Sequence, residues 1–252
     1  MMILKNISKT GIVDVVRCDE PHYLIWKWRP DGMKLGESER ENAIRCGSTL
    51  RVKAGEVAVF ISRQEDRVIQ SFIEGPFDGP LITDNIPFLT DIANIGFGGK
   101  SIFQSEVYFI NLEKNIQIRF GVPFFDVYDS KFPDISVPVA VRGNLTFNIT
   151  DYERFIGYHR TMNIGVDDFK KRIRDIVNKH VKEIVMEAPD ANNISLLKLG
   201  TKTSVISEEI ETYIRDRLGE EFAVNVTSLD ITDVEFDESD LGYHKLVQAM
   251  ES

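Results

Sequence analysis

The sequence predicts an α+β protein, in which a small β-rich part precedes a long, twisted and mainly antiparallel sheet with two amphipathic helices. Three observations predict this class. Short runs of β-branched and aromatic residues fill the first 130 residues, a strict period of two covers residues 134–150, and a period of three to four residues then extends to about residue 218. The change of period marks the point at which strands give way to helices.

The N-terminal part is expected to consist of short strands separated by turns. Glycine and proline interrupt the chain at Gly75-Pro76 and at Asp78-Gly79-Pro80, among other places. We therefore predict a compact β-rich subdomain over residues 1–130. Its expected strands are residues 12–18, 23–28, 57–61, 68–72, 106–111 and 116–120.

Residues 134–150, DISVPVAVRGNLTFNIT, are expected to form one nearly continuous strand. Every odd position from Ile135 to Ile149 is apolar or glycine, whereas the even positions are mostly polar. At about 3.3 Å per residue the strand would be roughly 50 Å long, with its odd-numbered side chains buried and its other face in water. Proline cannot donate a hydrogen bond to a neighbouring strand, so Pro138 predicts that part of this strand lies near a sheet edge.

Two amphipathic helices are expected after this strand. The first has its apolar positions between residues 166 and 184 and is predicted to end before Ala188-Pro189, because the residue before a proline disfavours helix. The second is predicted at about residues 204–218, with Gly219 as its C-terminal cap. Its apolar stripe consists of Ile206, Ile210, Tyr213, Ile214 and Leu218.

A last strand is expected over residues 222–236. Its alternation changes phase twice, which predicts β-bulges near Thr227-Ser228 and near Thr232-Asp233. Residues 238–252 form a short, weakly helical tail. The expected organisation is a β-rich subdomain at 1–130, an α/β core at 131–237 and the tail at 238–252.

Composition excludes several classes of function. A net charge of -10 argues against nucleic acid as a partner and against electrostatic adhesion to anionic lipid. The spacing of Cys18 and Cys46 fits no metal or redox motif, so two reduced thiols in a cytosolic protein are expected. We find neither a signal peptide nor the roughly 20 apolar residues that cross a bilayer.

No motif in the sequence indicates catalysis, a metal or a cofactor. The four histidines are dispersed, and His180 on the apolar side of its helix is expected to be a hydrogen-bonded core residue. The glycines of residues 96–101 lack the spacing of a phosphate loop and predict a structural turn. Acidic pairs at Asp167-Asp168 and Glu208-Glu209 are expected at or near helix starts, where they favour the helix dipole.

Large apolar residues in or beside predicted loops are the candidates for a contact surface. Such residues either pack into a core, which is the default, or meet a partner, a subunit or a membrane. If several are exposed together, they mark the membrane-proximal or subunit-proximal face. The candidates are Phe88, Leu89, Phe97, Phe103, Phe124 and Phe125.

The order of these parts resembles the SPFH or band-7 superfamily, which includes stomatins, prohibitins and flotillins. The resemblance rests on the strand at 139–149 leading into Thr150-Asp151-Tyr152, on the two helices, and on VTSLDITDV at 226–234. Within the superfamily the chain is more similar to the bacterial branch labelled "virion core protein-like". The segments that carry this similarity are IWKW at 25–28, GSTLRV at 47–52, EVAVF at 56–60, Gly75-Pro76, NIP at 85–87 and, most specifically, GFGGKSIFQSEVYF at 96–109.

The sequence departs from that branch at RFGV, residues 119–122, where members tend to have Trp-Gly-Thr after a basic residue, and it shows no zinc ribbon. The resemblance implies a non-enzymatic scaffold without cofactor or small-molecule substrate. It would form homo-oligomers and act with a membrane protein partner at the cytoplasmic face of the cell membrane. The alternative function is a soluble module that binds a protein or peptide along an exposed sheet edge.

Overall fold

The computed structural model describes residues 14–30, 42–45, 47–64, 67–82, 102–112, 115–160 and 165–251. By their internal contacts the residues form two compact units, Met1–Leu112 with His159–Gly165, and Glu113–Tyr158 with Val166–Ser252. Each unit is described by itself. The fold is α+β with mainly antiparallel sheets, as the sequence predicts.

The first unit contains nine described strands in three small sheets. A four-stranded sheet has the order β2-β9-β5-β6, a three-stranded sheet the order β1-β4-β7, and β3 pairs with β8. A turn at 53–55 separates β4 from β5, and the predicted turn at Gly75-Pro76 separates β6 from β7. The prediction of a turn at Asp78-Gly79-Pro80 is wrong, because these residues form β7 and pair with β4. The strands are β1 Val15–Val16, β2 Ile25–Lys27, β3 Ala43–Arg45, β4 Thr49–Val52, β5 Glu56–Gln64, β6 Arg67–Glu74, β7 Phe77–Pro80, β8 Ile102–Gln104 and β9 Glu106–Asn111.

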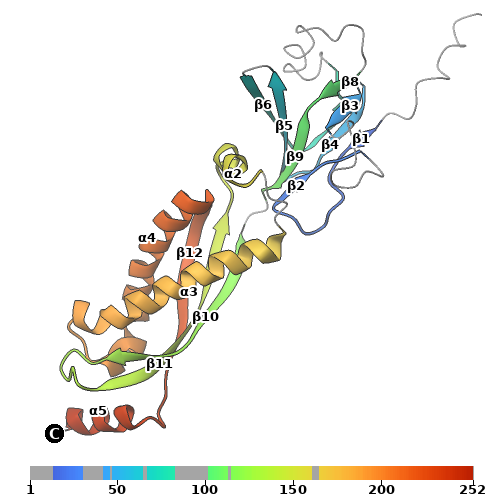
Figure 1. Ribbon diagram of the computed structural model, residues 1–252. Helices are drawn as coiled ribbons and strands as arrows, with labels where there is room; N and C mark the ends of the chain where they lie inside the picture. Colours follow the sequence, from blue (N-terminus) through green and yellow to red (C-terminus); the bar gives the residue numbers. More distant parts are fainter. Residues whose placement is uncertain are drawn as a thin grey trace, which may run out of the picture. The chain divides into compact units, whose positions relative to one another are not determined.

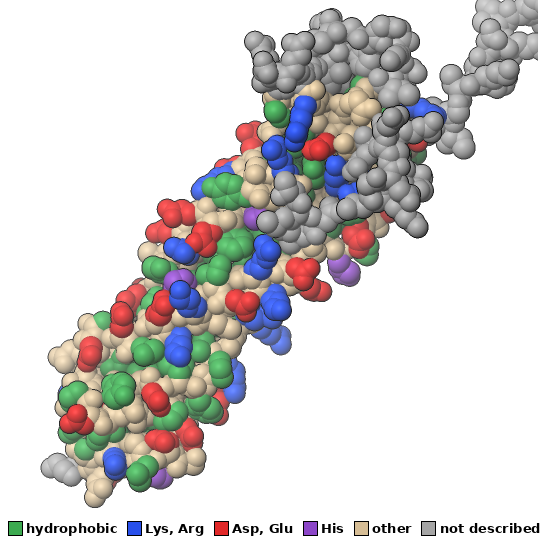
Figure 2. Space-filling view, in the orientation of Figure 1, with side chains coloured by type: hydrophobic (Ala, Val, Ile, Leu, Met, Phe, Trp, Pro, Cys, Tyr) green, Lys and Arg blue, Asp and Glu red, His purple; other side chains and the backbone are tan. Residues whose placement is uncertain are grey.

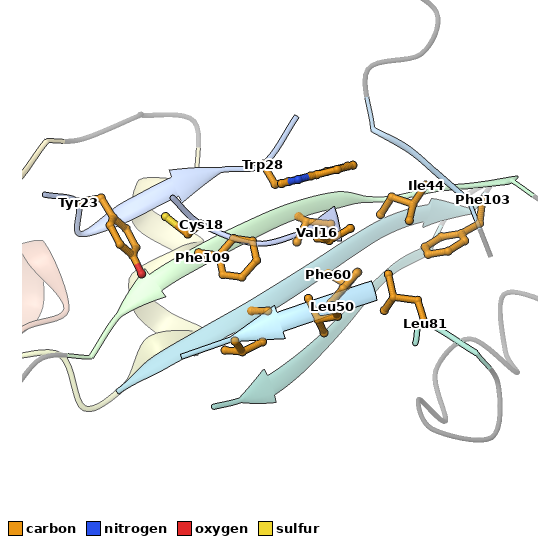
Figure 3. Close-up of a cluster of buried hydrophobic side chains, with 13 residues drawn as sticks. Val16, Cys18, Tyr23, Trp28, Ile44, Leu50, Phe60, Leu81, Phe103 and Phe109 are labelled. Carbon is orange, nitrogen blue, oxygen red and sulfur yellow. The ribbon is translucent and has the colours of Figure 1, made fainter. Parts of the chain in front are cut away.

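Side chains from these sheets meet in a common apolar core. Figure 3 shows Phe60 and Phe109 of neighbouring strands, Leu50 of β4 and Trp28 gathered in one cluster. Phe103 is also buried there, so this candidate contact residue is a core residue. Because burial of a large aromatic side chain contributes on the order of 1.5–3 kcal/mol, this cluster holds the small sheets together.

The second unit is built on one antiparallel sheet of three long strands, β10 (Ile116–Tyr128), β11 (Ser136–Asn148) and β12 (Asn225–Phe236), in the order β10-β11-β12. The predicted long strand is confirmed, and all its odd-numbered residues from 137 to 147 are buried. Of the even positions, Ala140 alone is buried as well. The contacts place β10 with this unit, and the domain limits at 130 and 237 remain a prediction.

The prediction that part of the strand near Pro138 lies near a sheet edge is confirmed locally: β11 is the central strand, but its pairing with β12 reaches only Val139. The structure gives a local reason why proline is tolerated. The carbonyl of Pro138 accepts a hydrogen bond from the amide of Asp237, directly after β12 has ended at Phe236. Since the nitrogen and carbonyl of one strand residue point the same way, the missing donor of Pro138 faces the end of β12 and breaks no ladder bond.

Both predicted bulges in β12 are confirmed. The register with β11 shifts between Ser228 and Val226 and again between Asp233 and Ile231, which leaves Thr227 and Thr232 as the extra residues. Each threonine hydroxyl donates a hydrogen bond to a carbonyl of β11, Thr227 to Thr146 at 3.1 Å and Thr232 to Arg142 at 3.2 Å. The extra residues are therefore tied to the sheet through their side chains.

Helices α3 and α4 lie along one face of this sheet, α3 beside β10 and α4 beside β12 (Figure 1). The helices of the unit are α2 Tyr152–His159, α3 Val166–Ala191, α4 Thr203–Phe222 and α5 Leu241–Glu251, with a 3-10 helix, η1, at Leu196–Thr201. Phe147 and Phe155 both contact the ring of Phe169 in the core beneath α3. The weakly helical tail that the sequence predicts is α5.

The predicted ends of both long helices are wrong. Helix α3 continues through Pro189 and ends at Ala191. The carbonyl of Pro189 accepts a hydrogen bond from the amide of Ile194, and Asn193 adopts a left-handed conformation (φ 49°), so the helix ends in a Schellman motif. Helix α4 continues past Gly219, and Ala223 (φ 53°) is the left-handed residue that follows it. Of the predicted α4 stripe only Tyr213 is exposed, and its ring lies 4.7 Å from that of His180.

Candidate interaction surfaces

The face of the second sheet that carries the even-numbered side chains of β11 is open to solvent and polar. Side chains of β10 and β12 on this face are exposed, and those of the central strand are mostly half-buried between them. Arg142 of β11 bonds to Asp233 at 3.3 Å and to Glu235 at 2.9 Å, and Asn225 donates to Asn148 at 3.0 Å. A broad polar face of this kind can meet another protein but offers no enclosed space for a reaction.

The outer edge of β12 is closed by side chains from α4. The amide of Ile231 donates to the Oγ atom of Ser207 at 3.0 Å, and the amide of Leu229 donates to the Oε2 atom of Glu211 at 3.2 Å. One turn further along, Nε of Arg215 donates to the carbonyl of Val226 at 3.4 Å. Spacing by four residues places these three side chains in one row beside the strand.

The outer edge of β10 lies against α3. Nε of Arg174 donates to the carbonyl of Arg119 at 3.0 Å, and the ammonium group of Lys182 lies 5.5 Å from the ring centroid of Phe125. Both long edges of the sheet therefore carry helix side chains bonded to the strands.

The predicted apolar contact residues have different positions. Phe124 is 50% exposed beside a bulge in β10, whereas Phe125 is buried on the core face. Phe88, Leu89 and Phe97 lie outside the described residues. Tyr128, four residues after Phe124, is 55% exposed, and the sequence analysis missed it because a single tyrosine in a strand carries no distinguishing signal. The role of Phe124 and Phe125 in partner or membrane contact remains a prediction.

Two buried polar side chains of the first unit, Tyr23 and Glu56, are bonded to each other. The Tyr23 hydroxyl donates to Glu56, whose other oxygen accepts the amide of Lys53 at 2.9 Å. Burial, followed by the bond to Glu56, raises the pKa of Tyr23 above its usual range. Burial also raises the pKa of the Cys18 thiol to about 11, which keeps this free cysteine protonated and unreactive at neutral pH. Cys46 lies outside the described residues.

A buried carboxylate organises the turn between β10 and β11. Asp129 accepts hydrogen bonds from the amide of Leu196 at 2.7 Å, the hydroxyl of Ser195 at 2.9 Å and the amide of Lys131 at 2.8 Å. Burial alone would raise the pKa of Asp129, but these bonds outweigh it and hold the pKa below its ordinary value. The arrangement ties the hairpin to the start of η1 and is structural.

The structure does not bring a catalytic set of side chains together in the parts it describes. An open cavity of about 330 Å³ lies where α2, α4 and the start of β12 meet, and both acidic and basic side chains line it, among them Arg154, Asp216 and Glu220. His180 is buried and hydrogen-bonded to Glu183 at 2.9 Å, as predicted. Over the described residues, no group of histidine, cysteine or acidic side chains could hold a metal ion.

The fold and its surfaces define a class of protein, a mixed α+β domain with long sheet edges and an open polar face. The sequence model of the SPFH domain-Band 7 family matches residues 38–244, so the chain belongs to that family. Among curated proteins it is similar to the uncharacterized protein YdjI of Bacillus subtilis (strain 168), with 26% identity over 155 residues, 60% of this chain and 46% of that protein. The chain spans about half the length of this relative.

Membership confirms the resemblance to the SPFH or band-7 superfamily and suggests a scaffold-type role, while the resemblance to one bacterial branch stays a prediction. The family is generally non-enzymatic. No helix among the described residues is long and apolar enough to cross a bilayer.

Proposed function

We propose that this protein is a non-enzymatic scaffold that assembles with copies of itself and organises proteins at the cytoplasmic face of a membrane. The observation that carries the proposal is the family match over residues 38–244, which includes the whole sheet of the second unit together with α2, α3 and α4. Multivalency provides the mechanism, because weak contacts repeated through an assembly gain avidity without any single strong site.

The charge of the chain indicates how it reaches a membrane. A net charge of -10 is repelled by anionic headgroups, so membrane association requires a protein partner or the avidity of the assembly. Purified protein mixed with vesicles of anionic phospholipid should therefore stay in the supernatant, while the protein in its native cell co-sediments with membranes as a large particle. Tight binding of the purified monomer to the vesicles would contradict the need for a partner, and a wholly soluble, monomeric protein in the cell would contradict the scaffold.

A second candidate function is the capture of an extended peptide, and the β6 edge favours it. Among the described strands β6 pairs only with β5, and Val68 on it is 54% exposed. An incoming strand could add to such an edge by β-augmentation. A stable monomer that binds unrelated extended peptides in a manner abolished by Gln70→Pro would favour this function over the scaffold.

A further inference from the structure

The hairpin end of the second sheet carries exposed apolar side chains on its open face, and a bulge in β10 is the reason. The register with β11 shifts between Val122 and Phe125. Pro123 and Phe124 therefore both stand opposite Ala140, and both are exposed. Ala140 is only 7% exposed although it lies on the open face, so the side chains of its neighbours cover it. The bulge thus presents two adjacent apolar side chains to solvent.

Two further side chains of β10 continue this surface. Asp126 and Tyr128 are exposed, and they pair with Pro138 and Ser136 of β11, which are half-buried. Along β10 the exposed residues thus alternate between aromatic, acidic and aromatic, two residues or about 6.6 Å apart. We call this surface the hairpin patch, and it consists of Phe124, Asp126, Tyr128, Pro138 and Ala140.

The charge around the hairpin patch is negative. Asp126 lies inside it, and Asp233 and Glu235 lie across β11 on β12. Arg142 bonds to both of these β12 carboxylates, at 3.3 and 2.9 Å, so its charge is already matched. The chain adds more acid after β12, because residues 233–251 contain six acidic residues and one lysine. A cation that approaches the patch therefore meets an excess of negative charge.

Basic side chains nearby do not cancel this excess. Lys182 of α3 contacts β10 from the helix side of the sheet. In the hairpin, exposed Lys131 is matched by exposed Asp134. Arg119, further along β10, shares its row of the sheet with Asp230. Figure 2 shows the α3 side of the unit, where basic and acidic side chains are intermixed, so the charge of the hairpin patch distinguishes it from that side.

This charge selects among the possible occupants. A second copy of the chain, with a net charge of -10, would be repelled, and so would anionic lipid or nucleic acid. A segment rich in lysine and arginine is attracted, because its cations can pair with Asp126 and lie over the exposed aromatic rings. Membrane proteins carry such segments, since lysine and arginine are enriched in their cytoplasmic loops next to the membrane spans.

We propose that the hairpin patch binds a cytoplasmic segment of a membrane protein that is rich in lysine and arginine. The inference rests on the proposed scaffold function and assigns the surface and the chemistry of its partner. An extended segment places every second side chain on one side, which matches the spacing of Phe124, Asp126 and Tyr128. Exposed ion pairs are screened by salt, so binding weakens as ionic strength rises. An acidic protein is then held at a membrane by the basic flank of its partner.

Fluorescence anisotropy of a labelled peptide tests the proposal with the full chain. The probe has three repeats of Arg-Leu-Lys-Ser, and a comparison peptide has Glu in place of every Arg and Lys. The wild type should bind the basic peptide and leave the acidic one free. Asp126→Lys and Phe124→Ala should each raise the Kd about tenfold. Arg142→Gln frees Asp233 and Glu235 and should lower the Kd about threefold, a gain that a folding defect would not give.

Matched controls alter the same kinds of side chain on α4. Glu209→Lys changes the net charge by as much as Asp126→Lys, and Val205→Ala shortens a side chain that is 46% exposed. Both should bind the basic peptide like the wild type, and thermal melts should show that all variants fold. If Glu209→Lys weakens binding as much as Asp126→Lys, the attraction is diffuse and the patch is wrong. A wild type that binds neither peptide also overturns the patch.

Vesicles separate this inference from the scaffold function on which it rests. Phosphatidylcholine vesicles that carry the basic peptide on a synthetic transmembrane helix should sediment with the wild type and not with Asp126→Lys. Bare vesicles should leave both proteins in the supernatant. Equal binding to bare vesicles would make lipid the partner and overturn the proposal. Failure with the peptide vesicles overturns the patch alone, because self-assembly of the purified protein is measured without any peptide or vesicle.

Discussion

The backbone amide of Ile231 at the outer edge of β12 donates a hydrogen bond to the Oγ atom of Ser207 on α4, at 3.0 Å. Glu211 accepts the amide of Leu229 in the same way, so the donors that an added strand would use at these positions are occupied. Unpaired edge groups invite further strands, and native proteins protect them. These two positions of the β12 edge are therefore closed to an incoming strand.

The Ser207–Ile231 bond should contribute measurably to stability. Ser207→Ala removes the acceptor from an amide at the strand edge, and we expect a loss of about 1 kcal/mol in the free energy of unfolding. Urea denaturation measures this change. Ser204→Ala, an exposed position one turn earlier on α4, is the matched control and should be nearly neutral. Equal losses in the two variants would show that the bond to Ile231 has no special role.

The two faces of β11 should respond oppositely to a negative charge. Val141 and Phe147 are completely buried, so Val141→Asp or Phe147→Asp places an unpaired charge in the core at a cost of several kcal/mol, against a total stability of roughly 5–15 kcal/mol. Both variants should be unfolded. Asn144→Asp on the open face should melt close to the wild type, and a thermal melt that ranks the three variants otherwise contradicts the assignment of faces.

Replacing either of two glycines on neighbouring strands, Gly121 of β10 or Gly143 of β11, should change the stability by very different amounts. A Cβ atom at Gly143 would clash with the ring of Phe120 and with the backbone oxygen of Asp230, whereas the nearest atom to one at Gly121 is 3.9 Å away. Gly143→Ala should therefore lose at least about 1–3 kcal/mol, while Gly121→Ala should be neutral or slightly stabilising. Chemical denaturation of both variants is the test, and comparable stability of the two would contradict the packing around Gly143.

The bonded carboxylate of Asp129 predicts a dependence of stability on pH. Its pKa is lower in the folded protein than in the unfolded chain, so the unfolded chain binds the proton first as pH falls. The stabilisation is fully present above the unfolded value, about 3.9, and is lost as pH falls through the lower folded value. Asp129→Asn should be less stable than the wild type at pH 7, and this difference should shrink below about pH 4.

The control for this prediction is Asp126→Asn on β10, three residues before Asp129, because Asp126 is exposed and Asp129 is buried. Unfolding free energies of the three proteins over a pH series provide the comparison. A gap between wild type and Asp129→Asn that stays constant through the acid range would contradict the role of the bonds from Leu196 and Ser195.

Features that repeat along the chain could be predicted from the sequence. The alternation of residues 134–150 predicts β11, and the two changes of phase predict the bulges at Thr227 and Thr232, because a period of two fixes which side chain faces the core. The family could be assigned as well, since the residues of the strands and the closing segment carry it.

Features that depend on tertiary contacts could not be predicted. Pro189 and Gly219 are helix terminators by local preference, but a Schellman turn at Asn193 and the left-handed Ala223 set the observed ends. Pro138 correctly indicated a local edge, but the sequence could not show that β11 is the central strand over the rest of its length. The edge contacts of Ser207 and Glu211 pair residues 24 and 18 positions apart, which no periodicity shows.

Self-assembly is the central claim, and sedimentation velocity of the purified wild-type protein over a range of concentrations tests it most directly. We predict a species much larger than 28.8 kDa that grows with protein concentration. A single 28.8 kDa species at every concentration and at low salt would contradict the claim.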